Sequence, residues 1–320
     1  MVRYDQEAAE RGQKYIEDQR GSGGRRGASA SAGGLPIGKV GGLAGVIIAV
    51  LVAVLGGGAL NDGGGTNSGF GIGSARLDDG AQVATDVGNT GPAVDPDADT
   101  KAYMGFLMLD IQEVWTEYFE QAGLQYQETK MVLFSDAVST GCGNATSAVG
   151  PFYCPAPGDN KIYVDLDFYD ELADRFGAPG DFAQAYVIAH EVGHHIQSVT
   201  GISDEVRQAQ SENPGAKNEL SVRQELQADC LAGVWAFSAA KRTTAAGQPI
   251  IEQGDFSEGL GAAAAVGDDR IQASAGMTVD PHTWTHGSAE ARENWFMIGF
   301  RSGDPEQSET FGVPSDQVGL

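Results

Sequence analysis

The sequence predicts an α+β fold that is rich in helices and has one small sheet. Apolar residues recur at helical spacing in several long stretches of the 320-residue chain, whereas only two short runs have the composition of strands. We find no internal repeat in the sequence. A chain of this length forms one sizeable domain or two small ones, and we expect the folded domain to span residues 100–303.

The first 99 residues are predicted to lie outside this domain. Residues 1–39 are polar and contain glycine- and serine-rich runs that cannot build a core, so they are predicted to form a disordered cytoplasmic tail. Residues 61–99 are rich in Gly, Asp, Asn and Thr, which is typical of a flexible linker.

Residues 40–60 are predicted to form a single transmembrane helix. No residue from Val40 to Asn61 is charged, and this length is enough to cross a bilayer despite several glycines. Basic residues precede the stretch, and none follows until Arg76. This bias places the N-terminus in the cytoplasm and the folded domain outside the cytoplasmic membrane. A cleaved secretory signal is the less favoured alternative, because the preceding segment is long and the sequence has no clear small-x-small cleavage site.

The charge of the chain excludes one class of partner. The net charge is −24, and residues 1–39 are slightly basic, so the acidic residues are concentrated in the rest of the chain. Nucleic-acid binding requires a basic face, and we therefore expect no nucleic-acid partner.

The first half of the folded domain contains both predicted strands. They are residues 131–134 and 162–166, which are short and rich in β-branched and aromatic side chains. A short helix is predicted over residues 168–176. Before the strands, a strongly amphipathic helix is predicted from apolar residues at helical spacing, namely Tyr103, Phe106, Leu107, Ile111, Val114, Trp115, Tyr118 and Phe119.

The second half is predicted to be helical. One helix lies between Asp181 and Gly201, and a long one spans residues 216–241. A further helical stretch covers residues 256–275, and a last helix begins near Ser288. The polar residues 304–320 are predicted to form a loose tail.

Two of the three cysteines are predicted to form a disulfide. Cys142 and Cys154 lie in one loop of a domain that we expect outside the cytoplasm, where disulfides form. Free thiols are the alternative. Cys230 lies within a predicted helix and is interpreted as a small buried apolar side chain.

The motif His-Glu-x-x-His predicts a zinc site in the helix before Gly201. His190 and His194 are four residues apart, so both imidazoles project from one helix face and can bind one Zn²⁺ ion. Glu191 is then placed to take a proton from a metal-bound water, as a general base. The alternative is a helix with surface histidines, but the flanking residues are apolar.

A catalytic zinc usually has a third protein ligand. A third histidine in the extended form of the motif is excluded, because Gln197 and Thr200 occupy the positions that it would need. We predict Glu225, on the next long helix, as the third ligand. A solvated acidic helix face is the alternative interpretation, and Glu219 and Glu205 are the next candidates as ligands.

Four further side chains near the motif have predicted roles. Asp229 lies one helical turn after Glu225 and is predicted to accept a hydrogen bond from a ligand histidine. His286 is predicted to stabilise the negative oxygen that forms during amide hydrolysis, although it could instead cap a helix or be exposed. His195 is interpreted as a surface residue or a neighbour of the ligands, and Tyr186 as a core residue.

Taken together, the motifs resemble the putative neutral zinc metallopeptidase family of bacterial membrane-anchored proteins. The matching segments are residues 190–197, 225–233, 285–288 and 150–155, within a region of about residues 100–302. The resemblance implies a zincin-like metallopeptidase fold with Zn²⁺ held by two histidines and a glutamate. It does not identify a natural substrate.

Two functions from different classes follow from these predictions. The first is a membrane-anchored zinc metallopeptidase that hydrolyses protein or peptide substrates outside the cytoplasmic membrane, with Glu191 as the general base. The second is a non-catalytic, zinc-stabilised module that binds envelope partners. Glu191 favours the first, because a structural zinc usually has four protein ligands and does not need a base beside it.

Overall fold

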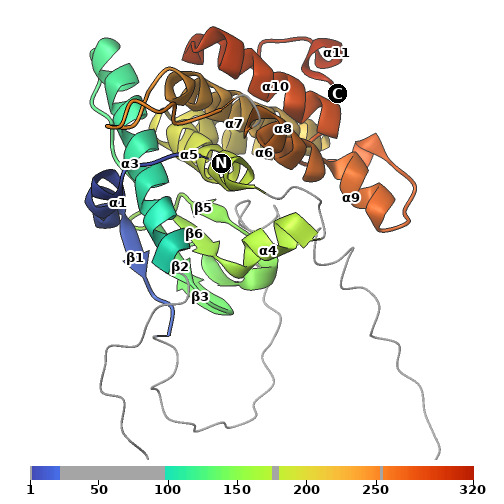
Figure 1. The fold of residues 1–320 in the computed structure, drawn as a ribbon. Coiled ribbons are helices and arrows are strands. Elements are labelled where there is room, and N and C mark those ends of the chain that lie inside the picture. Colours follow the sequence, from blue (N-terminus) through green and yellow to red (C-terminus); the bar gives the residue numbers. More distant parts are fainter. Residues whose placement is uncertain (1, 22–97, 175–179, 253–254) are drawn as a thin grey trace, which may run out of the picture.

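The computed structural model describes residues 2–21, 98–174, 180–252 and 255–320. Two small sheets and a larger group of helices form one body (Figure 1). The prediction of a helix-rich α+β fold is confirmed. The predicted transmembrane helix 40–60 and the linker 61–99 lie outside the described residues, apart from the last two linker residues. None of the helices in the described part combines the length and apolar composition that a bilayer crossing requires.

The main sheet has four strands in the order β1-β2-β6-β5. The central strands β2 (Lys130–Phe134) and β6 (Lys161–Asp165) are parallel and correspond to the two predicted strands. β1 (Ile16–Asp18) extends the sheet in parallel on one side, and β5 (Phe152–Cys154) pairs antiparallel with β6 on the other. The edge strands were not predicted, because three residues are too few to show a strand pattern.

The residues of this sheet alternate between two apolar clusters. Met131, Leu133 and Ile162 face the main core, whereas Val132 and Phe134 face a second cluster. A two-stranded antiparallel sheet, β3 (Ala137–Thr140) with β4 (Gly143–Thr146), covers the second cluster. The predicted single sheet is therefore two sheets. The predicted disulfide between Cys142 and Cys154 links this hairpin to β5, and Cys230 is a free, buried thiol.

The helices supply most of the core. α5 (Asp181–Val199) is buried along nearly its whole length, and it packs against α7 (Lys217–Ala240) and α8 (Asp255–Ala265). α3 (Ala98–Gln121) crosses the same layer, and α10 (Ala289–Ser302) packs along α7. Figure 1 shows this helical group on one side of the sheets.

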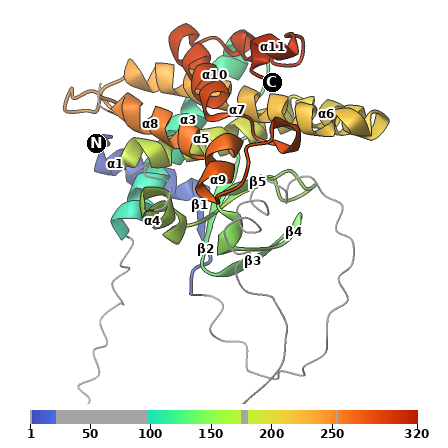
Figure 2. The same cartoon turned by 90° about the vertical axis from the view of Figure 1, so that its right-hand side faces the viewer.

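Shorter elements complete the domain. They are α4 (Asp167–Asp174), α6 (Ile202–Glu212), α9 (Asp268–Ser274), and the 3-10 turns η4 (Ser147–Val149), η5 (Pro214–Ala216) and η6 (Pro281–Thr283). In Figure 2, α6 projects from the body. The predicted helix 256–275 is two helices, α8 and α9, separated at Gly267. α6 was not predicted, because its sequence is mostly polar.

The prediction that residues 1–39 form a disordered tail is wrong for residues 2–20. α1 (Gln6–Gly12) packs on α3, and η1 (Gln13–Tyr15) leads into β1. The two helices touch at glycines: a Cβ atom built on Gly12 would lie 1.8 Å from the carbonyl oxygen of Gly105. The ring of Tyr4 lies against Tyr103 and Phe106, with centroid distances of 5.6 and 5.4 Å.

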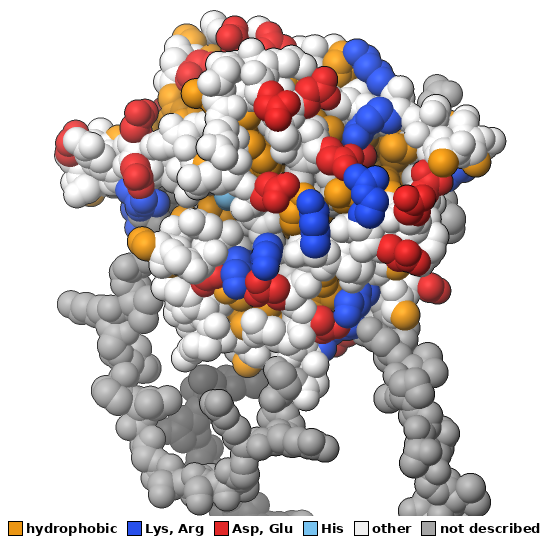
Figure 3. All heavy atoms as spheres, turned by 90° about the vertical axis from the view of Figure 1, so that its left-hand side faces the viewer, with side chains coloured by type: hydrophobic (Ala, Val, Ile, Leu, Met, Phe, Trp, Pro, Cys, Tyr) orange, Lys and Arg blue, Asp and Glu red, His pale blue; other side chains and the backbone are white. Residues whose placement is uncertain are grey.

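Ion pairs also attach this N-terminal segment, residues 2–20, to the domain. Asp18 binds Lys101 at 2.8 Å, and Glu17 contacts Lys130 and Lys161. Figure 3 shows basic and acidic side chains interspersed on the face of the molecule to the left in Figure 1. The charged residues that suggested disorder in this segment therefore form specific ion pairs with the domain.

The pairing of β1 with β2 has a consequence for membrane topology. Residues 16–18 and 131–133 are neighbours in one sheet, so both lie on the same side of any membrane. A single crossing at residues 40–60 would separate them. The predicted combination of a cytoplasmic N-terminus with an external folded domain is therefore incompatible with this fold.

The prediction of a loose tail at residues 304–320 is also wrong. η7 (Pro305–Ser308) and α11 (Ser315–Val318) pack back on the helices, and Val318 is buried. Trp295 donates a hydrogen bond to the carbonyl of Val318 at 3.0 Å, and the buried Arg223 donates to the carbonyls of Thr310 and Val313. Backbone acceptors, which the side-chain composition does not reveal, hold this segment in place.

Candidate metal centre

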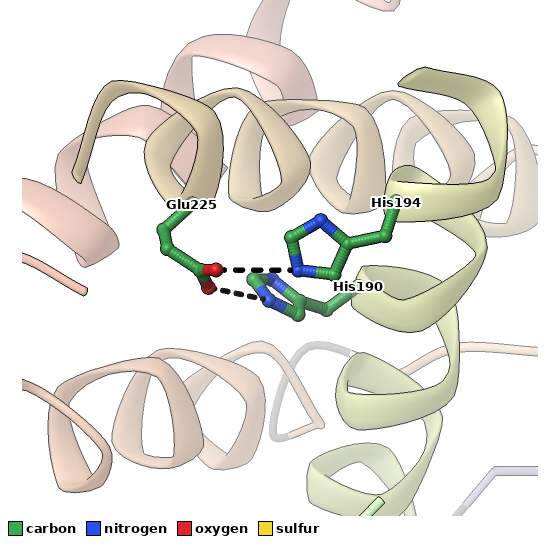
Figure 4. Close-up of side chains that lie close together, drawn as sticks. All are labelled: His190, His194 and Glu225. Carbon is green, nitrogen blue, oxygen red and sulfur yellow. Dashed lines mark hydrogen bonds and ion pairs between the residues drawn. The ribbon is translucent and has the colours of Figure 1, made fainter. Parts of the chain in front are cut away.

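Three predicted ligands from two helices meet in the interior. α5 contributes His190 and His194, and α7 contributes Glu225, as Figure 4 shows. The Nε2 atom of His190 lies 3.2 Å from one carboxylate oxygen of Glu225, and the Nε2 atom of His194 lies 3.5 Å from the other. All three side chains are buried. The tertiary structure thus brings together residues that are 31 and more positions apart in the chain.

The geometry of these donors fits a zinc ion. Ligand atoms about 2.0–2.2 Å from one zinc, in tetrahedral directions, lie roughly 3.4 Å from each other. The two measured nitrogen–oxygen distances, 3.2 and 3.5 Å, are close to this separation. Two buried polar atoms at the site, His194 Nε2 and Glu191 Oε2, have no hydrogen-bond partner among the described residues. Buried polar atoms normally have partners, and a metal with its water would supply them.

Hydrogen bonds behind the ligands set the orientation of both rings. Asp229 accepts a hydrogen bond from His190 Nδ1 at 2.8 Å, as predicted. Gln197 plays the corresponding role for His194, whose Nδ1 lies 2.9 Å from the Gln197 side-chain oxygen. In each case the partner occupies Nδ1, so Nε2 faces Glu225. The role of Gln197 was not predicted, although it lies one helical turn after His194.

Asp229 is the centre of a buried network that sequence analysis did not find. Arg292, from α10, donates through Nε and Nη2 to the two oxygens of Asp229, at 2.8 and 3.0 Å. The hydroxyl of Tyr186, from α5, donates to the same carboxylate. Burial alone would raise the pKa of Asp229, but Arg292 and His190 keep it below its usual value. Asp229 is therefore an anion behind the metal site.

Glu191 lies beside the ligands in a different environment. Its side chain is buried, and burial raises the pKa of the carboxyl, while His194 and His190 act in the opposite direction. For Glu225, burial would also raise the pKa, but the charge of His194 and the hydrogen bond to His190 hold it well below its usual value. The two glutamates are thus distinguished as a candidate base and a candidate ligand.

A cavity adjoins the metal site. Its lining includes His190, Glu191 and Glu225, together with His286 and Arg292, and one part is apolar, formed by Pro151, Phe168, Val187, Val266 and Ile271. His286 is buried at this cavity. It neither caps a helix nor lies exposed, which were the alternatives from the sequence.

Other candidates from the sequence lie away from the metal. Glu219 binds Arg223 and Ser315, and Glu205 is exposed, so neither is a ligand here. The interpretation of His195 from the sequence, as a surface residue or a neighbour of the ligands, is wrong. It is buried, and its ring nitrogens contact the Tyr153 hydroxyl and the Gln127 carbonyl, which joins α5 to β5 and to the segment before β2.

Comparisons with known proteins agree with the site. The profile of the family described as "Putative neutral zinc metallopeptidase" matches residues 6–311, beginning at the first residue of α1. The uncharacterized protein YpfJ of Escherichia coli K12 is 41% identical over 299 residues, which is 93% of this chain and 95% of YpfJ. The uncharacterized protein Rv2575 of Mycobacterium tuberculosis H37Rv is 46% identical over 193 residues, 59% of this chain and 64% of Rv2575. No solved structure matches the chain.

Proposed function

Since the chain belongs to the putative neutral zinc metallopeptidase family, we propose that it hydrolyses peptide bonds in protein or peptide substrates outside the cytoplasmic membrane. The observation that carries this proposal is the buried group of His190, His194 and Glu225, with Glu191 beside it. Together these residues supply three metal ligands and a separate base, which is the composition of a hydrolytic zinc site.

A zinc ion held by the three ligands would polarise the scissile carbonyl and lower the pKa of a water molecule. Glu191 would accept the proton that such a water releases and pass it to the leaving amine. Its Oε2 atom has no protein partner within the described part of the chain, so this oxygen is available for the transfer. The raised pKa that burial gives this carboxyl brings it closer to the range in which it can both accept and release a proton.

His286 supports the same step from the cavity wall. Nε2, the ring nitrogen that makes no hydrogen bond to the described residues, would donate one to the carbonyl oxygen as negative charge develops on it. Asp229 contributes indirectly, because its hydrogen bond to His190 keeps Nε2 of that ring directed at the metal position.

The proposed location rests on the disulfide. A bond between Cys142 and Cys154 is typical of proteins outside the cytoplasm. Residues 2–20 share a sheet with the rest of the domain, and we place them in the same compartment. Contact of residues 40–60 with the cytoplasmic membrane stays a prediction from their composition.

The alternative, a non-catalytic zinc-stabilised module, explains fewer features of the site. A structural zinc usually has four protein ligands, whereas three candidate ligands meet here in the described residues. A buried carboxylate beside the metal, with one oxygen unbound, costs stability in a module that performs no proton transfer.

Hydrolysis of a disordered protein such as casein separates these functions. We expect cleavage by the full-length protein, loss of cleavage with a zinc chelator, and recovery when zinc is added back. Glu191→Gln is the matched control, since it keeps the shape of the side chain. Absence of zinc-dependent cleavage, or cleavage that Glu191→Gln leaves unchanged, would support the binding module.

A further inference from the structure

A carboxylate that is not part of the metal site holds the ring of His286. His286 lies in the segment between η6 and α10, at the wall of the cavity that also contains Glu191 and Glu225. Asp268, the first residue of α9, is buried beneath this segment. It is 18 residues before His286 in the chain, and no pattern in the sequence relates the two.

Asp268 binds this segment with both carboxylate oxygens. One oxygen accepts hydrogen bonds from the backbone N–H groups of Thr285, His286 and Gly287, at 2.8, 2.7 and 3.0 Å. The other oxygen lies 3.1 Å from Nδ1 of His286. The backbone N–H of Asp268 donates to the carbonyl of Gly287 at 2.9 Å. These contacts fix both the backbone and the ring of His286.

The chemistry of the carboxylate decides which ring nitrogen carries hydrogen. An ionised carboxylate only accepts hydrogen bonds, so Nδ1 of His286 must be the N–H donor towards Asp268. Burial alone would raise the pKa of Asp268, but His286 and the backbone N–H groups hold it below its usual value. The hydrogen bonds of the ring to described residues all use Nδ1, which leaves Nε2 for the cavity.

We infer that Asp268 is a positioning residue for His286. It accepts the hydrogen on Nδ1, places a negative charge beside the ring, and directs Nε2 at the reacting carbonyl. This inference rests on the proposed hydrolase function and deepens it, because it assigns the residue that orients His286 at the cavity wall. Charge-assisted hydrogen bonds are roughly twice as strong as neutral ones.

Asp268→Asn tests the inference with little change in shape. The amide oxygen is needed by the three backbone N–H groups, so the NH₂ group must face His286. The ring then has to accept at Nδ1, and its hydrogen moves to Nε2. Asp269→Asn is the matched control: Asp269 is the next residue on α9 and accepts a hydrogen bond from the Ala289 N–H at 2.7 Å, but the ring of His286 is not among its hydrogen-bond partners.

Nitrogen NMR of protein labelled with ¹⁵N-histidine gives a readout that is independent of activity. The chain has five histidines, and His286→Gln identifies the His286 signals. We expect hydrogen on Nδ1 in the wild type and in Asp269→Asn, and on Nε2 alone in Asp268→Asn. A wild-type ring with hydrogen only on Nε2 would overturn the inference, even if Asp268→Asn failed to fold.

Kinetics of zinc-loaded enzyme then test the coupling. We expect His286→Gln to lower kcat by roughly a hundredfold, the usual effect of losing a donor to the developing oxyanion. Asp268→Asn should lower kcat by about tenfold or more in the wild type, and should have no further effect when His286 is already Gln. Asp269→Asn should stay within about twofold of the wild type.

Two outcomes separate this inference from the proposed function. Equal losses from Asp268→Asn in both backgrounds, or equal losses from Asp268→Asn and Asp269→Asn, would show a merely structural role, while hydrolysis by the wild type would still stand. Absence of zinc-dependent hydrolysis in the wild type contradicts the proposed function itself.

Discussion

The Nδ1 atom of His190 lies 2.8 Å from Oδ1 of Asp229. Asp229 also accepts hydrogen bonds from two nitrogen atoms of Arg292, so the positive guanidinium balances the negative charge of the buried carboxylate. A metal-binding histidine whose second nitrogen donates to a carboxylate has a fixed tautomer and a more basic ligand nitrogen. The hydrogen bond between His190 and Asp229 therefore makes the zinc affinity of the site depend on how α10, which carries Arg292, packs against α7.

Asp229→Asn should weaken zinc binding by about ten- to a hundredfold, because the amide no longer supports the ring of His190 as an anion does. Competition with a chromogenic chelator measures this affinity. Asp110→Asn is the control: Asp110 is also buried and binds Arg242 and Trp235, but its hydrogen-bond partners belong to the α3–α7 packing. If both variants lose zinc to the same extent, general destabilisation is the cause, and the role of Asp229 is wrong.

Glu191→Gln should keep about one zinc per chain and lose about a hundred- to ten-thousand-fold in hydrolysis rate, since only proton transfer is removed. Metal content by mass spectrometry and rate are measured on one preparation. A variant with zinc and full activity would contradict the role of Glu191 as the base.

Glu225→Ala should lose zinc retention and thermal stability together, because bound metal stabilises only the folded state. The control is Glu219→Ala on the same helix, which should retain zinc, since Glu219 binds Arg223 and Ser315 instead. Retention of zinc by Glu225→Ala would require a different third ligand.

Mass mapping of unreduced peptides should find Cys142 linked to Cys154 and Cys230 free. The bond closes a loop with a sequence separation of 12, for which loop entropy predicts a stabilisation of about 3 kcal/mol. The double substitution of Cys142 and Cys154 by Ser should lower the unfolding free energy accordingly. Reduction of the wild type should give a similar loss, and a peptide containing paired Cys230 would refute the assignment.

Residues 2–20 and the rest of the domain should lie on the same side of the membrane. Glu7→Cys on α1 and Glu212→Cys at the end of α6 introduce exposed thiols into a chain whose own cysteines are either paired or buried. A membrane-impermeant maleimide added to intact cells should label both variants to the same extent. Labelling of Glu212→Cys without Glu7→Cys would restore the single crossing that this fold excludes.

Acid should weaken the attachment of β1. Hydrogen bonds from Arg20 and Lys101 hold the pKa of Asp18 below its usual value, and those from Lys161 and Lys130 do the same for Glu17. A carboxyl group with a lowered folded-state pKa stabilises the fold above its unfolded pKa of about 4, and this stability is lost as the pH falls further. The protection factors of residues 6–18 against hydrogen exchange, which are corrected for the intrinsic pH dependence, should therefore fall below about pH 5, before those of α7. Asp18→Asn should reduce this pH dependence, and protection factors that are unchanged down to pH 3 would contradict it.

The sequence by itself determined the centre of the site, because the geometry of a helix relates nearby positions. Two histidines four residues apart must share a face, so the pair His190 and His194 follows from the spacing alone. Glu225 and Asp229 are separated by the same spacing, and this allowed their different roles to be predicted once their helix was recognised. The long helices were predictable for the same reason, since their apolar residues repeat over several turns.

Only the tertiary structure decided which distant residues complete these elements. β1 has three residues and a polar sequence, and it is a strand because β2 offers it a partner more than 100 positions later. Arg292 and Asp268 look like ordinary charged helix residues until packing removes them from water. A buried charge must then find a partner, and the partners, Asp229 and His286, are set by how the helices cross, which no local spacing encodes.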